Sequence, residues 1–327
     1  MTSTAISSRR RPLVPGTIRA IARSRQGLIG LIVLIFFAIA AIIGPVLVGP
    51  IDRAGAYPSL LDPSAIHPFG TDASGRDLLT LNVHGTRVSM LVGVVSSVLS
   101  MVVGTGVGIV AGYLGGRFES TLMRITDFFY VLPTLVLALV LSAVLGPNMT
   151  NVIAVIALTS WPSTARVIRA QTLTIRERTF VDRARAYGAS SARIMRRQVL
   201  PNVFGLVMAN TTLTIAGAIF LETTLSFLGV GPRETYSWGR ILEESFAEGA
   251  LTLGRWAWFV PPGLAVVLVI LAFTMLGSAF DEIFDPRLRK RSSGAAGPTD
   301  VTGTDVGHHP HHDQIDDAAT TIVTGRG

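Results

Sequence analysis

Residues 172–202 read TLTIRERTFVDRARAYGASSARIMRRQVLPN, a long polar stretch that lies between two apolar segments. The stretch carries seven arginines and only two acidic residues, Glu177 and Asp182. Charge at this density is too costly to place in hydrocarbon, so the stretch must form a loop on one side of a membrane. Because short loops rich in Arg and Lys stay in the cytoplasm, this loop is predicted to be cytoplasmic.

The same loop has a helical pattern. At spacings of i, i+4 and i+7, one helix face is expected to carry Phe180, Ala184, Tyr187 and Gly188. The small residues on that face would let another protein surface approach closely. The pattern therefore favours a docking segment over a basic loop that only orients the chain.

The composition is typical of a polytopic membrane protein. The mean hydropathy is +0.51 and only 15% of the residues are charged, fewer than a soluble domain of this length carries. The absence of cysteine excludes disulfides, thiol catalysis and cysteine-based metal sites. The net charge of +7 comes from arginines that flank apolar runs, so membrane topology explains it and no nucleic-acid partner is expected.

Six apolar runs predict an all-α polytopic membrane protein with six transmembrane helices. The runs cover about residues 28–48, 88–114, 128–145, 152–168, 203–228 and 256–280. Trp161-Pro162 is expected to bend or end the fourth helix. By alternation both termini are cytoplasmic, and residues 49–84 and 229–255 lie outside.

The predicted organisation has five parts. They are a cytoplasmic basic arm with an interfacial helix (residues 1–27), the first transmembrane helix (28–48), an external loop (49–84), a five-helix core (85–284) and a cytoplasmic, largely disordered tail (285–327). The tail contains four histidines, at positions 308, 309, 311 and 312. With no partner ligands fixed in space, these are interpreted as an incidental polar tract rather than a metal site.

Small residues recur every four positions in the second run, at Ser96, Ser100, Gly104, Gly108, Gly112 and Gly116. This spacing puts them on one stripe of a helix, where the backbone of another helix can approach closely. Gly104, Gly108 and Gly112 are therefore predicted to be helix-packing residues. The regular spacing favours packing over a flexible helix that gates.

A compact charged segment precedes the second run. Its glycines and charges predict an ordered turn in which Arg76 pairs with a carboxylate, and its charged residues are Asp72, Arg76 and Asp77. Four potential metal ligands fall in this region, but no metal is expected because they lack the spacing of a metal site: His67, Asp72, Asp77 and His84.

A few ionisable and polar residues lie inside the apolar runs. The ionisable side chain of Glu222 has a high free-energy cost in hydrocarbon unless it faces water or a partner. Its two possible roles are a pore-facing or gating one, and a hydrogen bond to Ser or Thr of a neighbouring helix. Asn210 and Thr214 lie in the same run, which is therefore predicted to line a translocation path. Arg124 and Asp127 are expected to pair with each other or with a neighbouring helix.

The loop at 172–202 resembles the EAA loop of ABC-importer permeases, which reads Glu-Ala-Ala, three residues, Gly, nine residues, then Ile-x-Leu-Pro. Asp182-Arg183-Ala184 stands in the place of the triplet, and the spacing to Gly188 and to Leu200-Pro201 is intact. The departures are Asp for Glu, Arg for the first Ala and Gln198 for Ile. The resemblance implies a short coupling helix that docks in a groove of an ATPase subunit, through Phe180, Asp182, Arg183, Ala184, Tyr187, Gly188, Leu200 and Pro201.

A second resemblance covers about residues 15–291. The segment HPFGTDASGRDLLTLNVHGTRVSMLVG, residues 67–93, is similar to the C-type permease of dipeptide and oligopeptide importers, in which GTD-x-x-GRD precedes the second span. The match continues in order through the motifs at 122–127, 225–229, 237–239 and 285–287. It implies a type I ABC importer permease (MetI-like) fold in the bacterial plasma (inner) membrane.

This resemblance implies a pore-forming subunit of an ATP-driven importer of di- and oligopeptides. Its partners would be a B-type permease, two ATPase domains or subunits, an extracytoplasmic peptide-binding protein and membrane lipid. The chain has no Walker A sequence and no catalytic constellation, so it is not expected to be an enzyme. ATP and magnesium are expected in the partner subunits and no cofactor in this chain. Relatives that import nickel or glutathione share the architecture and remain alternatives.

Two functions of other classes compete with this interpretation. An ion-coupled secondary transporter would need coupling carboxylates near the membrane midplane, for which Glu222 alone is thin support. It would also leave the EAA-like spacing unexplained. A membrane sensor or scaffold would use the arginine-rich loop to dock a signalling partner. Stoichiometric ATPase subunits would separate an importer from both.

Overall fold

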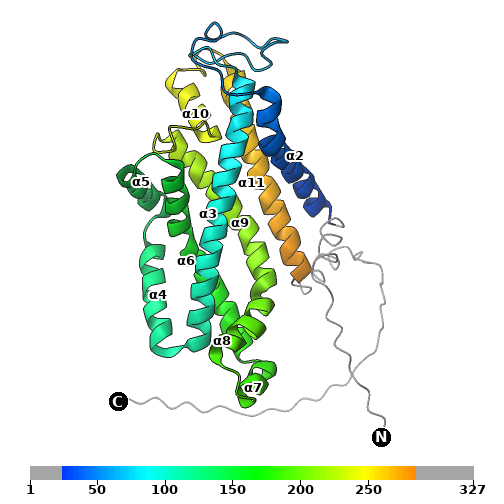
Figure 1. The fold of residues 1–327 in the computed structure, drawn as a ribbon, viewed down its shortest axis with the longest axis vertical. Helices are drawn as coiled ribbons and strands as arrows, with labels where there is room; N and C mark the ends of the chain where they lie inside the picture. The colour runs from blue at the N-terminus through cyan, green and yellow to red at the C-terminus, as the bar shows by residue number, and fades with distance from the viewer. Residues whose placement is uncertain (1–23, 285–327) are drawn as a thin grey trace, which may run out of the picture. The chain divides into compact units, whose positions relative to one another are not determined.

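The computed structural model describes residues 24–284, and the described part is helical, with a single isolated β-bridge between Thr71 and Asp77 (Figure 1). Five helices are long and apolar enough to cross a membrane, and a bent pair of shorter helices can supply a sixth crossing. The predicted all-α fold with about six spans is therefore confirmed. The predictions for the basic arm before residue 24 and for the histidine-containing tail lie outside the described residues.

The helices follow one another with short connections, apart from three longer irregular segments, 49–77, 228–237 and 248–255. In chain order they are α2 Arg25–Val48, α3 Leu78–Leu114, α4 Gly116–Val131, α5 Thr134–Leu145, α6 Met149–Arg176, α7 Thr179–Ala186, α8 Ser191–Ile194, the π-helical turn η1 Met195–Val199, α9 Leu200–Phe227, α10 Trp238–Ala247 and α11 Trp256–Phe284.

The third predicted span, 128–145, is not one helix. It is replaced by α4 and α5, which meet at an angle of 88°. The break falls at Leu132, whose backbone is extended (φ −70°, ψ 132°), directly before Pro133. Proline disfavours the helical conformation of the residue before it and supplies no N–H for a helical hydrogen bond. The apolar run continues across the break, so hydropathy alone does not reveal it.

Two other helices are longer than predicted. α3 begins at Leu78, ten residues before the predicted start, because the Asp77 carboxylate caps it by accepting from the Thr80 N–H. α6 does not end at Trp161-Pro162 but continues to Arg176 with the proline inside it.

A short amphipathic helix, α10, was not predicted. It lies within the segment 229–255 and begins after Ser237, whose hydroxyl accepts from the Arg240 N–H. Figure 1 shows α10 at one end of the described helices and α7 at the other. These are called the α10 end, comprising residues 49–77, 228–255 and the adjoining helix termini, and the α7 end, comprising residues 176–200.

Helix α3 packs against α6 through the small-residue stripe. A methyl group placed on Gly104, Gly108 or Gly112 would lie 2.7 to 2.9 Å from a backbone carbonyl oxygen of α6. Contact this close is possible only without a side chain, so these glycines set the distance between the two helices. The stripe ends there, because Gly116 starts α4 and has nothing within 4 Å of its Cβ position.

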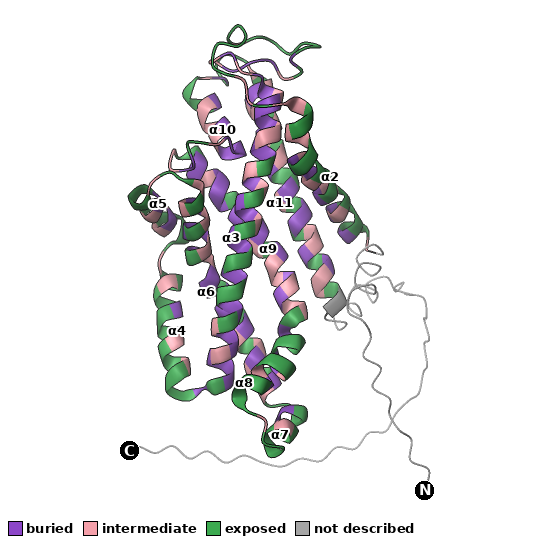
Figure 2. Ribbon diagram, viewed as in Figure 1, coloured by how far each residue is buried: buried purple, intermediate pink, exposed green. Residues whose placement is uncertain are grey.

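Many large apolar side chains are exposed, and Figure 2 shows exposed residues along the long helices. On α2, for example, Phe36, Val46 and Leu47 are all exposed. An apolar surface of this extent is unfavourable in water and is what lipid or another membrane subunit covers.

Candidate coupling loop, translocation path and polar network

Helix α7 is attached to the rest of the chain by a small number of contacts. Val181 is fully buried in an apolar cluster with Ile175 of α6 and Ile194 of α8. Arg185 lies over the ring of Tyr113 at the end of α3, 5.3 Å from its centroid, and donates to its hydroxyl over 3.4 Å. The remaining faces of α7 are open.

Gly188 ends α7 in a left-handed conformation, with φ at +75°. Its N–H donates to the Arg185 carbonyl (2.9 Å), and the next N–H, of Ala189, donates to the Ala184 carbonyl (3.0 Å). This pair of bonds is the Schellman arrangement, which favours glycine because a Cβ is strained at positive φ. No described atom lies within 4 Å of the Cβ position, so conformation rather than space requires glycine here.

The predicted coupling residues of α7 differ in their exposure. Tyr187 is 90% exposed, and Phe180, Asp182 and Arg183 are exposed beside it. Ala184 is half-buried against the cluster around Val181 instead. That Ala184 shares its face with Phe180 and Tyr187 in contact with a partner stays a prediction, since Ala184 also contacts this cluster. In a helix of eight residues the buried side needs two contacts at the i, i+3 spacing, and Ala184 supplies the second.

Leu200 and Pro201 follow the π-helical turn η1 and begin α9. The Leu200 N–H bonds to the carbonyl of Met195, five residues back, which widens the turn. Proline has no N–H, and its ring would clash with the carbonyl four residues earlier in a regular helix. The wide turn removes that clash, so the helix continues through Pro201 without a break.

A cavity of about 750 Å³ lies between α4, α5, α6 and α9. Asn210 and Thr214, the residues predicted to line a path, both contribute to its wall, together with the broken segment around Leu132-Pro133. The Asn210 amide donates to Thr164 Oγ1 of α6 over 3.1 Å. Every described residue that lines this cavity is uncharged, so the cavity combines neutral polar groups with an apolar wall.

Glu222 is not part of this cavity. Its side chain is fully buried, and its carboxylate accepts from Ser226 of the same helix (2.8 Å) and from Ser89 of α3 (3.0 Å). Ser89 in turn accepts from the Trp238 N–H at the start of α10. The pore-facing prediction for Glu222 is therefore wrong, and its alternative, a hydrogen bond to a neighbouring helix, is what the structure contains. The carboxylate joins three helices.

The acidic residues of α4 pair with α6. Asp127 pairs with Arg166 at 2.5 Å rather than with Arg124. Asp127 was expected to pair either with Arg124 or with a neighbouring helix, and the structure contains the second pairing. Arg166 also stacks on Tyr130, 4.0 Å from its centroid. One helical turn away, Arg169 pairs with Glu119 of α4.

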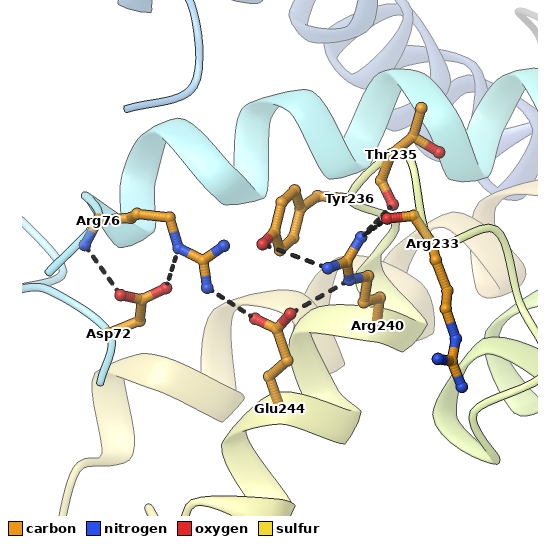
Figure 3. A network of polar contacts seen from close by, with 7 residues as sticks. All are labelled: Asp72, Arg76, Arg233, Thr235, Tyr236, Arg240 and Glu244. Carbon is orange, nitrogen blue, oxygen red and sulfur yellow. Dashed lines mark hydrogen bonds and ion pairs between the residues drawn. The ribbon is translucent and has the colours of Figure 1, made fainter. Parts of the chain in front are cut away.

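The α10 end contains a network of four charged side chains around Tyr236 (Figure 3). Asp72 accepts from the Arg76 guanidinium (2.6 Å) and from the Arg76 N–H (2.8 Å). Glu244 accepts from Arg76 at 3.3 Å and from Arg240 at 3.1 Å. The two guanidinium groups both lie over the Tyr236 ring, 4.8 and 4.1 Å from its centroid. The network ties the segment before α3 to α10.

Burial affects one carboxyl group of this network. Burial raises the pKa of Glu244 above its usual range, while the charges of Arg76 and Arg240 oppose that rise. The predicted ion pair of Arg76 is present with Asp72 as its partner. Asp77, the third charged residue of the turn, pairs with His67 at 2.8 Å besides capping α3.

Sequence reasoning missed Arg240 and Glu244 of the network, and Arg166 and Arg169 of α6. A usable signal existed for the first two: the i, i+4 spacing of an arginine and a glutamate directly after a serine cap. The pairs between α4 and α6 carry no such local signal, since their partners lie 39 and 50 residues apart.

Comparison with known proteins agrees with this architecture. Residues 104–290 match the family described as "Binding-protein-dependent transport system inner membrane component". The chain is 36% identical over 275 residues to the dipeptide transport system permease protein DppC of Bacillus subtilis (strain 168), covering 83% of this chain and 85% of the relative. It is 38% identical over 278 residues to a putative peptide transport system permease protein of Brucella suis biovar 1 (strain 1330), covering 84% and 92%.

A second protein of the same Brucella suis strain, a putative peptide permease protein, is 40% identical over 227 residues, covering 69% of this chain and 74% of the relative. Family matches of this length rule out the ion-coupled transporter and the sensor, and they imply an ATPase and a binding protein as partners. The chain belongs to the inner membrane components of binding-protein-dependent transport systems, as a multi-pass permease subunit of an ABC importer.

Proposed function

We propose that this chain is the C-type permease subunit of an importer of di- and oligopeptides. It pairs with a B-type permease, is driven by two ATPase domains and receives peptide from an extracytoplasmic binding protein. The names of three relatives that share most of their length with this chain support the peptide class. The neutral, partly polar cavity beside Asn210 and Thr214 suits a cargo whose side chains vary in charge.

The geometry of α7 is the main support for its role in coupling to the ATPase. A short helix anchored by one fully buried residue presents exposed Phe180, Arg183 and Tyr187 to the outside of the chain. An exposed aromatic pair beside arginines is the composition of a surface that binds another protein. In the proposal this surface docks in the ATPase, while ATP and magnesium are held by the ATPase and no cofactor by this chain.

The proposed orientation puts the α7 end and both termini in the cytoplasm and the α10 end outside. The arginines of residues 176–197 support it through the positive-inside rule. Reporter fusions after Asp72 and after Ser190 should report opposite sides of the membrane, and finding both on one side would contradict the topology.

The transport assay uses the full complex in proteoliposomes with its cognate binding protein. We expect ATP-dependent uptake of labelled di- or oligopeptides and no uptake without binding protein. Mass spectrometry of the ligand that co-purifies with the binding protein identifies the cargo independently. Uptake of nickel or glutathione with no peptide uptake would overturn the peptide assignment and leave the importer assignment in place.

A further inference from the structure

A second, smaller cavity of about 290 Å³ lies at the α10 end, between the end of α9, the following loop and α10. Ser226 and the glycines at 229 and 231 form its neutral wall, and Arg233, Arg240, Glu243 and Glu244 supply charge. The loop that carries Arg233 rests on the turn between α5 and α6, since the Arg233 N–H donates to the Pro147 carbonyl. The cavity therefore lies at the end of helices that also line the 750 Å³ cavity.

The charges of this region divide into two groups. Arg76, Asp72, Arg240 and Glu244 bond to one another, so two positive and two negative charges cancel. Arg240 is held further by the backbone carbonyls of Arg233 and Thr235 (Figure 3). This half-buried network is a fixed wall rather than a free binding group.

The other group has no partner within the described residues. The Arg233 side chain is exposed and its guanidinium makes no hydrogen bond or ion pair in the described part of the chain; Figure 3 shows it directed away from Arg240. Glu243 is half-buried and its carboxylate has no ion-pair partner among residues 24–284. One cation and one anion thus remain available at the wall of the same small cavity.

We propose that this cavity is a peptide-binding subsite of the permease itself. Arg233 binds the α-carboxylate of the incoming peptide and Glu243 binds its α-ammonium group. A guanidinium matches a carboxylate with two donors, and a carboxylate accepts from an ammonium group. Gly229 has nothing within 4 Å of its Cβ position and leaves the peptide backbone room to approach. The inference rests on the proposed function and adds a recognition site for the free termini of a short peptide.

The same two charges would also suit a salt bridge to the binding protein. The concave shape and small volume favour the peptide, because a flat, wide surface would be expected for a protein contact of useful size. The experiment separates the two occupants by omitting the binding protein.

The full permease–ATPase complex in lipid nanodiscs is titrated with dialanine, without binding protein, and contact is measured by saturation-transfer difference NMR. We expect binding of dialanine, and roughly tenfold weaker binding of N-acetyl-dialanine amide, whose termini carry no charge. Arg233→Gln and Glu243→Gln should each weaken dialanine binding by a similar factor, and Arg233→Lys should retain most of it. Glu234→Gln, an exposed neighbour outside the cavity, is the matched control and should bind as the wild type does.

Equal binding of free and blocked dialanine by the wild-type complex would overturn the inference, as would unchanged binding in the Arg233 and Glu243 variants. Unchanged dialanine binding together with weaker binding-protein affinity would overturn it in favour of protein docking. Failure of the proposed function is a separate result: the wild-type complex with its binding protein would then show no ATP-driven peptide uptake.

Discussion

Both ends of the molecule are rich in arginine, yet the two ends use it differently. At the α10 end, Arg76 and Arg240 are half-buried and bond to carboxylates of the same chain. At the α7 end, Arg183 is exposed and the one pair within α7, Arg185 with Asp182, is 3.4 Å long and open to solvent. The network around Tyr236 at the α10 end holds the fold together, whereas the exposed arginine of α7 stays available to a partner.

The largest expected effect follows from breaking the network at the α10 end. Asp72→Asn removes a carboxylate that is 1% exposed in its side chain and leaves Arg76 without its closest partner. We expect about 3–5 kcal/mol of lost stability, measured as a lower melting temperature of the purified complex. Asp62→Asn is the matched control. Its side chain is 85% exposed and pairs with Arg255, so about 1 kcal/mol or less is expected. Equal losses in the two variants would mean that burial does not distinguish these pairs.

At the α7 end we expect an effect on coupling in addition to one on stability. Gly188→Asp forces a side chain into the left-handed region, at a cost of about 1–2 kcal/mol, and adds a negative charge beside the proposed docking surface. Stimulation of ATP hydrolysis by loaded binding protein should fall at least roughly tenfold, a factor worth about 1.4 kcal/mol. Gly254→Asp is the control, because Gly254 has φ +69° and equally open space at the opposite end. A similar loss of stimulation in both would show strain, not docking, to be the cause.

Glu222 tests whether a carboxylate inside α9 belongs to the path or to the fold. Glu222→Gln keeps the size of the side chain and weakens its bonds to Ser89 and Ser226, for an expected loss of about 1–2 kcal/mol of stability. Peptide uptake per assembled complex should stay within about twofold of the wild type. A specific loss of transport, with normal assembly and melting temperature, would return Glu222 to the path.

The smallest effect concerns pH at the α10 end. Because burial raises the pKa of Glu244, the folded chain holds a proton there at a higher pH than the unfolded chain does. The stabilising contribution of that proton is full below the ordinary glutamate pKa and is lost as pH rises through the raised value. Glu244→Gln should therefore make the stability of the complex less dependent on pH over this interval. An unchanged pH slope would mean that the two arginines keep Glu244 ionised throughout.

Much of the fold follows from local pattern. The apolar runs locate the long helices because hydrocarbon requires apolar length, and the spacing of Gly104, Gly108 and Gly112 predicts a packing stripe because one turn repeats about every four residues. Pro133 carried the signal for the break between α4 and α5. The continuous hydropathy around it hid that signal.

The remaining features depend on the neighbours that the fold supplies. Glu222 has the same local sequence whether it faces a pore or Ser89, and only the position of α3 decides between them. Ala184 fits the helical face of Phe180 by spacing, and only the fold shows that it also contacts the cluster around Val181. Arg233 and Glu243 are ordinary charged residues of a loop and a helix until the fold places them on one cavity.

The wide turn at Met195–Val199 also sets the rotation of α8 about the axis of α9. Each residue of a helix rotates the chain by about 100°, so one residue more or fewer in this turn would rotate α8 by that angle about the axis of α9. The side chains of α7 would then face another direction while their own sequence stayed the same. The direction in which Tyr187 projects is thus set by a count of residues between it and Pro201. Insertions or deletions in that interval should be far more disruptive than substitutions at the same positions.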